Sequence, residues 1–292
     1  MIDYTPMNQP TSASSKFISP AWIHTHPRRD FLLFEVGSGA PDEYKAGHIP
    51  GSMYLNTNAL ECLPLWNRIP DKELESALLA HGITYDKTVV VYARGSTAAA
   101  RVAVILLYAG VQDVRLLDGG YNAWAMAGFP IEIGENLPVP ATAFGIGLPA
   151  RPEIFAGIEE VKSMLADGNG VVVSVRSWAE YIGETSGYDF IEPKGRIAGA
   201  VWGHAGSDKD RMEDYRSPDG TARPLEEIAA NWRKQGITPE RQVAFYCGTG
   251  WRASEAFFYA YAMEWKNISV YDGGWLEWSS DPSNPIETGI PE

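Results

Sequence analysis

Cysteine is scarce in this sequence: a chain of 292 residues contains only Cys62 and Cys247. The two lie in different halves and in different sequence contexts, which argues against a disulfide framework and against a zinc site. No apolar run of about 18 residues occurs, so the sequence predicts no membrane-spanning helix. Residues 1–15 lack the basic region and apolar core of a signal peptide. We therefore expect a cytoplasmic protein, or a periplasmic one if a signal peptide is missing from this chain.

Basic residues are also few, because 24 Lys and Arg stand against 37 Asp and Glu, which gives a net charge of −13. A field of this sign argues against nucleic acid and anionic membranes as partners. It also repels small anions at long range, so any anion site must be locally positive. The apolar fraction of 45% and the charged fraction of 21% are typical of a globular protein. The length favours two domains.

The most informative stretch surrounds Cys247. Residues 243–246 predict a buried strand, and residues 253–265 predict a helix. Gly248 and Gly250 lie between them and allow a tight turn whose backbone N–H groups point inward. A helix N-terminus adds partial positive charge, so this geometry binds anions and stabilises a thiolate. A purely structural buried cysteine would explain neither the two glycines nor the arginine that follows, Arg252.

The loop from Cys247 to Arg252, CGTGWR, resembles the active-site loop of rhodaneses, which are sulfurtransferases that carry sulfur as a cysteine persulfide. Four residues separate the cysteine from the arginine, whereas phosphatases related to this fold use a loop that is one residue longer. A tighter ring of N–H groups fits one extra sulfur atom on the cysteine better than it fits a phosphate. The spacing therefore favours sulfur transfer over a Cys-dependent phosphatase.

The two halves of the chain repeat one another. Residues 43–44 and 47–51 read Glu-Tyr and Gly-His-Ile-Pro-Gly, which resembles the rhodanese signature near the start of the domain. Three further anchors recur at one constant offset in the second half: residues 82–84 and 236–238, Tyr92 and Tyr246, and residues 118–124 and 272–278. A period this long indicates a tandem duplication rather than a solenoid.

Strands that alternate with helices in each half predict an α/β fold, with a mostly parallel sheet and helices on both faces. We expect a flexible segment at 1–16, a rhodanese-like domain at 17–133, a proline-rich linker at 134–152 and a second rhodanese-like domain at 153–292. Ala93 stands in the first half where Cys247 stands in the second. Alanine is no nucleophile, so the first domain is expected to be catalytically inactive and the second catalytic, as in two-domain rhodaneses and mercaptopyruvate sulfurtransferases.

The resemblance implies a thiosulfate sulfurtransferase. The Cys247 thiolate would take the sulfane sulfur of thiosulfate, and the persulfide would pass to cyanide, a thiol or a protein acceptor. The loop lacks the basic residues of the well-known thiosulfate enzymes, and its Gly248, Thr249 and Gly250 are similar to the mercaptopyruvate type. The alternatives are therefore a 3-mercaptopyruvate sulfurtransferase, or a sulfur-relay or docking protein without a small-molecule donor. We expect no cofactor and no metal.

The resemblance also suggests which residues bind the substrate. These are Gly248, Thr249, Gly250, Trp251, Arg252, Arg176 and His48. Arg176 would hold the anionic end of the donor, or it would form a structural ion pair with Glu180. His48 matches the first-domain histidine that partners the loop hydroxyl in mercaptopyruvate relatives, or it is a solvated or internally satisfied residue. Cys62 is expected to be a buried hydrophobic residue.

Overall fold

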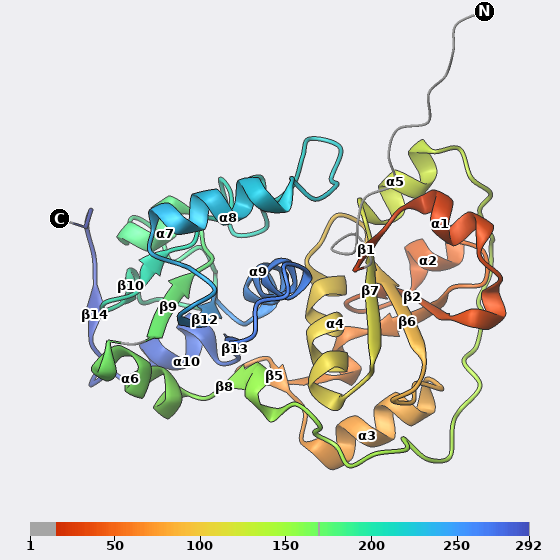
Figure 1. Ribbon diagram of the computed structural model, residues 1–292, viewed down its shortest axis with the longest axis horizontal. Coiled ribbons are helices and arrows are strands. Elements are labelled where there is room, and N and C mark those ends of the chain that lie inside the picture. Colours follow the sequence, from red (N-terminus) through yellow and green to blue (C-terminus); the bar gives the residue numbers. More distant parts are fainter. Residues whose placement is uncertain (1–15, 169, 292) are drawn as a thin grey trace, which may run out of the picture.

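The computed structural model describes residues 16–168 and 170–291. The expected flexible segment at 1–16 lies, except for Lys16, outside the described residues. The described chain contains two five-stranded sheets of the same topology (Figure 1). Among the described residues, no helix is long and apolar enough to cross a membrane.

The first sheet is built from residues 17–117, and all its paired strands are parallel. Its strand order is β1 (Phe17–Ile18), β7 (Asp113–Leu117), β6 (Thr88–Tyr92), β2 (Leu32–Gly37) and β3 (Met53–Asn56). The accompanying helices are α1 (Pro20–Thr25), α2 (Asp42–Ala46), α3 (Asp71–Ala80), α4 (Ala98–Ala109) and α5 (Gly120–Met126). A small antiparallel hairpin joins β4 (Glu61–Cys62) to β5 (Asn67–Arg68).

The second sheet repeats this arrangement with parallel strands. Its order is β8 (Phe155–Ala156), β13 (Ile268–Tyr271), β12 (Gln242–Tyr246), β9 (Gly170–Ser174) and β11 (Val201–Trp202). The helices are α6 (Ile158–Asp167), α7 (Trp178–Ile182), α8 (Leu225–Lys234), α9 (Trp251–Ala262) and α10 (Gly274–Ser280), and β10 (Arg196–Ile197) pairs with β14 (Ile286–Glu287). The expected α/β fold with mostly parallel sheets is confirmed.

Both faces of each sheet are buried, which explains why the central strands are continuous apolar runs. In β6, Val89 and Val91 pack on the α4 side, whereas Val90 and Tyr92 pack on the opposite side with Trp124 of α5. Successive side chains of a strand point to opposite faces, so only a strand covered on both sides needs apolar residues at every position.

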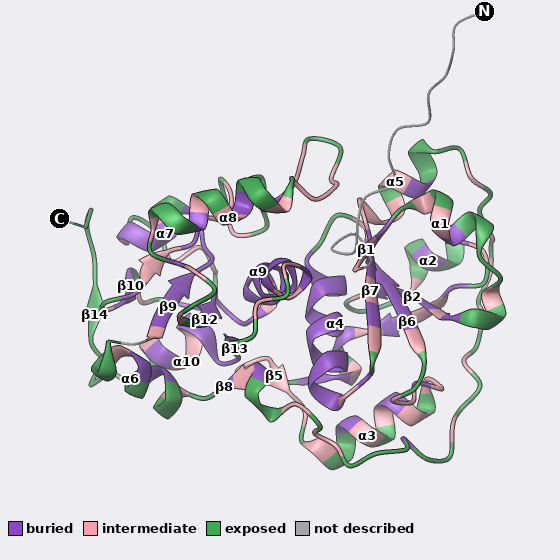
Figure 2. Ribbon diagram, in the orientation of Figure 1, coloured by how far each residue is buried: buried purple, intermediate pink, exposed green. Residues whose placement is uncertain are grey.

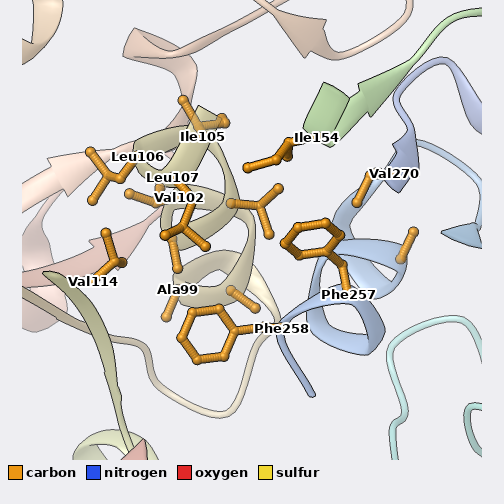
Figure 3. Packing of buried hydrophobic residues seen from close by; sticks show 14 of the residues in the cluster. Ala99, Val102, Ile105, Leu106, Leu107, Val114, Ile154, Phe257, Phe258 and Val270 are labelled. Carbon is orange, nitrogen blue, oxygen red and sulfur yellow. The ribbon is translucent and has the colours of Figure 1, made fainter. Parts of the chain in front are cut away.

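One hydrophobic core continues from the first sheet to the second through α4 and α9. Every residue of α4 is buried, and both helices are purple along most of their length in Figure 2. Phe257 and Phe258 of α9 lie beside Ala99 and Val102 of α4 (Figure 3). A helix that is apolar on all sides needs partners on all sides, and α4 finds them in its own sheet and in α9. The two halves therefore share a packed interface rather than a hinge.

Candidate active site

Cys247 follows β12 directly and lies at the carboxyl edge of the second sheet, as expected. It is buried, with a relative exposure of 1%. The helix that follows begins at Trp251, two residues earlier than the sequence predicts, because Gly250 at φ +92° caps it in a left-handed conformation. Trp251 and Arg252 are thus in the first turn of α9 rather than in the loop.

The loop closes so tightly that it requires its glycines. A Cβ atom on Gly248 would lie 2.2 Å from Cζ of Tyr188. On the other side, the backbone N–H groups of Trp275 and Leu276 donate to the carbonyls of Cys247 (2.7 Å) and Gly248 (3.1 Å). A Cβ on Gly274 would come within 2.7 Å of both carbonyls. The second Asp-Gly-Gly turn therefore holds the cysteine loop in place.

Arg252 is held by the protein itself. Its guanidinium donates to both carboxylate oxygens of Glu180, at 2.8 and 2.9 Å, and to the phenol oxygen of Tyr188 at 2.8 Å. Glu180 also accepts from the backbone N–H and hydroxyl of Ser177, which caps α7. Burial would raise the pKa of Glu180, but its hydrogen bonds with Arg252 and the charge of that residue outweigh burial and lower it. Through these contacts Arg252 fixes the end of the loop to α7 and to Tyr188.

We expect Glu180→Gln to destabilise the protein by about 3–5 kcal/mol at pH 7, because it leaves the buried Arg252 charge unpaired. The folded pKa of Glu180 is lowered, so the pair stabilises the protein above the ordinary carboxyl pKa of 4.5 and loses that contribution as the pH falls through the folded value. The difference in the free energy of unfolding between wild type and variant should therefore become smaller below pH 4.5. Urea denaturation at pH 7 and at pH 4 measures it, and a constant difference would contradict the assignment.

Trp251 connects the loop to the first domain. Its indole N–H lies 3.0 and 3.1 Å from the two carboxylate oxygens of Glu61. Glu61 also accepts from the fully buried Arg101 of α4 at 2.7 Å, and Arg101 forms a second ion pair with Asp272 at 2.6 Å. Asp272 precedes the Gly-Gly turn that holds the loop, so this network ties both sides of the loop to the first domain.

A cavity of about 320 Å³ opens over the loop, between the two domains. From the second domain, Tyr188, Lys209, Asp210, Thr249, Trp251 and Arg252 line it, and from the first domain, Arg94, Gly95, Ser96 and Thr97. Burial raises the pKa of Tyr188 to about 12, so its phenol stays protonated at neutral pH. Because Arg252 donates to the phenol oxygen, the phenolic hydrogen is free to donate to another group. The cavity offers Thr249 and Tyr188 as hydroxyl donors.

Arg176 and His48 do not line this cavity. Arg176 is fully buried; it donates to the Gly195 carbonyl, contacts Ser174 and lies over the ring of Trp275 at 4.9 Å. It thus forms no close ion pair with Glu180, and its role in binding the donor stays a prediction.

His48 is also fully buried, and the fold places it among residues of the first half of the chain. Its ring nitrogens lie 2.8 Å from the Tyr44 carbonyl, 3.2 Å from Asn136 and 3.5 Å from Glu132. The structure does not bring it to Thr249, and a substrate-binding role for His48 likewise stays a prediction.

Cys62 is exposed, so the expectation of a buried hydrophobic residue was wrong. It stands in the two-residue strand β4, where neighbouring side chains point to opposite sides. Glu61 takes the inward side and meets Arg101 and Trp251, which leaves Cys62 outside. Sequence reasoning also missed Glu61 and Arg101, which reach the loop only through the packing of the domains. It missed Tyr188 because this residue lies 59 positions before Cys247 and only the fold of the second domain brings it to the loop.

The position that matches Cys247 in the first domain is closed. Ala93 lines a cavity of only about 80 Å³, and Arg216 of the second domain reaches across to the carbonyls of Gly95 (2.9 Å) and Ser96 (3.3 Å). Arg216 is anchored by Glu255 of α9. Arg216 therefore holds the first domain's loop against the second domain, while Gly95, Ser96 and Thr97 still line the larger cavity.

We expect Ala93→Cys, combined with Cys247→Ser, to restore no sulfur transfer. The first loop has no residue equivalent to Gly250 or Arg252, and its cavity is about a quarter of the volume of the other. Donor turnover of the double variant, compared with Cys247→Ser alone, measures this. Turnover near that of wild type would show that neither the loop sequence nor the closure by Arg216 matters.

No group of three His, Cys, Asp or Glu side chains among residues 16–168 and 170–291 is arranged to hold a metal ion. The chemistry that the described site offers comes from the thiol, the hydroxyl groups and the backbone N–H groups of the loop.

Comparison with known proteins agrees with this geometry. Residues 23–127 and 157–281 match the rhodanese-like domain. The chain is 52% identical to the thiosulfate sulfurtransferase YnjE of Escherichia coli (strain K12) over 94% of its own length, and it spans about 65% of that relative. The crystal structure of YnjE superposes with a TM-score of 0.93 at 50% identity, over 97% of this chain and 70% of that one.

A second solved protein, EanB, was determined in complex with hercynine and superposes with a TM-score of 0.93 at 43% identity, over 98% of this chain and 72% of its own. EanB was also solved as a cysteine persulfide with ergothioneine, at a TM-score of 0.92 and 42% identity over 96% of this chain and 72% of its own. The family match covers both halves of the chain. The loop of the second half has its cysteine, Cys247, and the loop of the first half has Ala93 at that position. The chain belongs to the rhodanese family and carries two rhodanese-like domains.

Proposed function

We propose that the protein is a sulfurtransferase that carries sulfur as a persulfide on Cys247, with the second domain catalytic and the first inactive. The observation that carries this proposal is the loop itself. Cys247 follows β12, and a tight turn with Gly248 and Gly250 leads from it to α9, while Thr249 and Trp251 line a cavity of about 320 Å³. The dipole of α9 favours the thiolate and the negative charge of the persulfide.

The reaction has two halves. In the first, the Cys247 thiolate attacks the outer sulfur of thiosulfate; the new S–S bond forms, the old one breaks with its electron pair, and sulfite leaves. In the second, cyanide or a thiolate attacks the outer sulfur of the persulfide and regenerates the Cys247 thiolate, with thiocyanate or a new persulfide as product. Covalent catalysis of this kind predicts ping-pong kinetics.

Thiosulfate is the donor that we propose first, since the 52% identical relative is named for it. The 3-mercaptopyruvate alternative rests on Thr249, which lines the cavity as a hydroxyl in the loop. A sulfur-relay protein without a small-molecule donor is the third possibility, and the 320 Å³ cavity that Thr249 of the cysteine loop lines disfavours it. YnjE is named for thiosulfate and EanB was solved with hercynine and with ergothioneine, so the shared fold alone does not select the substrates.

A second candidate function has a specific observation in its favour. EanB structures were determined for variants in which one threonine or one tyrosine is substituted. Counted along the sequence, these two residues lie as far from the persulfide cysteine of EanB as Thr249 and Tyr188 lie from Cys247. Both residues line the cavity here. The sulfur acceptor would then be a small heterocycle of the hercynine type, bound between Tyr188 and Thr249, rather than cyanide or a thiol.

The release of sulfite from thiosulfate and of pyruvate from 3-mercaptopyruvate tests the donor, with cyanide, dithiothreitol and hercynine offered in turn as acceptors. We expect sulfite release that depends on Cys247. Pyruvate release alone would reverse the donor assignment. Consumption of hercynine in preference to the other acceptors would replace the first candidate by the second.

A further inference from the structure

The charged side chains that line the active-site cavity differ in how far they are already paired within the protein. Its cationic side chains are Arg94, Lys209 and Arg252, and its one carboxylate is that of Asp210. Arg252 is paired with Glu180 through two hydrogen bonds, and that carboxylate is fully buried. Such a pair presents little net charge to a ligand.

Arg94 is also paired with a buried carboxylate. It donates to both carboxylate oxygens of Glu35, at 2.6 and 3.2 Å, and to the carbonyl of Gly47. Its guanidinium also lies 3.6 Å from the centre of the Tyr121 ring. These contacts use the Nε and Nη2 donors of Arg94 inside the first domain, and Glu35 balances its charge.

Lys209 differs from both arginines. Among the described residues, the only carboxylate within 4.0 Å of its ammonium is that of Asp189, which is fully exposed to water and therefore screened. Asp208, its neighbour in the chain, accepts from the backbone N–H of Lys209. The Lys209 side chain is about a third exposed and lies on the cavity wall with Thr249 and Trp251. Its charge is available to a ligand.

The cavity is also the meeting point of two helix N-termini. Trp251, the first residue of α9, and Thr97, the N-cap of α4, both line it. Both helices are 12 residues long, and each adds partial positive charge at its first turn. The hydroxyl groups of Ser96, Thr97 and Thr249 on the same walls can donate to an oxyanion. The surroundings of Lys209 therefore complement a small anion.

We propose that Lys209 is the specificity-determining residue that binds the oxyanion end of the sulfur donor, a sulfonate or carboxylate group, while its sulfur faces Cys247. The assignment rests on the proposed function. It gives the anion a different partner from Arg176, which is fully buried and does not line the cavity. An ammonium is a compact point charge on a flexible stem, which suits the tetrahedral sulfonate end of thiosulfate.

The irregular segment that carries Lys209 fits this role because it lies between the domains. It belongs to the connection from β11 to α8, and the end of that connection extends toward the first domain (Figure 1). Further along it, Arg216 contacts Gly95 and Ser96, and the backbone N–H of Ala222 donates to Asp118 at 2.7 Å. These contacts hold the segment over the cavity.

Binding of thiosulfate to the Cys247→Ser variant by isothermal titration calorimetry tests the proposal without turnover. Adding Lys209→Ala should weaken binding about tenfold, the low end for a charge-assisted contact because the site is partly exposed. Lys209→Arg should retain most of the affinity. Lys72→Ala, at an exposed position on α3, removes the same charge elsewhere and should change nothing. The loss should shrink at high salt.

Steady-state kinetics distinguish an effect on donor binding from an effect on the sulfur-transfer steps. In the Cys247 enzyme, Lys209→Ala should raise KM for thiosulfate about tenfold and leave the discharge of a preformed persulfide to neutral dithiothreitol unchanged. Thiosulfate affinity in Lys209→Ala equal to that in Lys72→Ala, or no binding to Cys247→Ser at all, would overturn the proposal. Binding that depends on Lys209, in an enzyme that forms no persulfide, would refute the proposed function and leave the anion site standing.

Discussion

Cys247→Ser is expected to lower sulfur transfer by about four orders of magnitude or more, the largest effect of any substitution that we consider. A serine hydroxyl cannot hold a transferable sulfane sulfur, so neither half-reaction has a substitute route. The backbone is expected to stay unchanged, because the carbonyl of residue 247 still accepts from Trp275 N–H and the glycines on either side of the turn remain.

The matched control is Cys62→Ser. Cys62 is the only other thiol of the chain and is exposed on β4, so the control removes a sulfur atom without entering the loop. Turnover of thiosulfate with cyanide as acceptor, measured for both variants at equal folded concentration, gives the comparison. A Cys247→Ser variant that kept a tenth of wild-type turnover, or a Cys62→Ser variant that lost it, would contradict the assignment.

The second large effect concerns stability. We expect Arg101→Met to lower the free energy of unfolding by about 3–5 kcal/mol, because it leaves the Glu61 and Asp272 carboxylates without their buried partner. Burial alone would lower the pKa of Arg101, but the charges of Asp272 and Glu61 outweigh it and raise the pKa, so the guanidinium is charged. Methionine keeps the unbranched stem and some of its packing, so most of the loss is electrostatic.

Guanidinium chloride denaturation followed by tryptophan fluorescence measures this loss. The matched control is Arg115→Met, which breaks a partly exposed pair with Asp113 and should cost about 1 kcal/mol or less. Adding Glu61→Gln to Arg101→Met should recover part of the stability, since it removes one unpaired charge. An Arg101→Met variant as stable as Arg115→Met would contradict the interdomain network.

The sequence predicts the parts of the site that are continuous in the chain. The strand before Cys247, its two glycines and the helix after it are a local pattern, and the constant offset between the halves predicts both the repeated fold and the missing nucleophile at Ala93. The start of α9 was misplaced by two residues, because the left-handed conformation of Gly250 caps the helix earlier than the apolar pattern indicates.

The rest of the site depends on contacts between distant segments. Tyr188 and Lys209 lie in irregular stretches without any periodicity, and only the tertiary fold of the second domain brings them to the same cavity as Thr249. Matching motifs placed Arg176 and His48 by their position in the chain, but a motif does not tell whether a side chain ends in a cavity or beneath it. The sequence places Arg252 among the expected substrate-binding residues, and no local motif reveals its buried ion-pair partner Glu180, which lies 72 positions away.

In the proposed reaction, Cys247 carries the transferred sulfur. Mass spectrometry of the whole protein after reaction with thiosulfate and removal of excess donor, followed by peptide mapping under non-reducing conditions, tests it most directly. We predict one added sulfur atom, located on the peptide that contains Cys247 and removed by cyanide. Added sulfur on Cys62 instead, or an unmodified chain after exposure to thiosulfate and to 3-mercaptopyruvate, would contradict it.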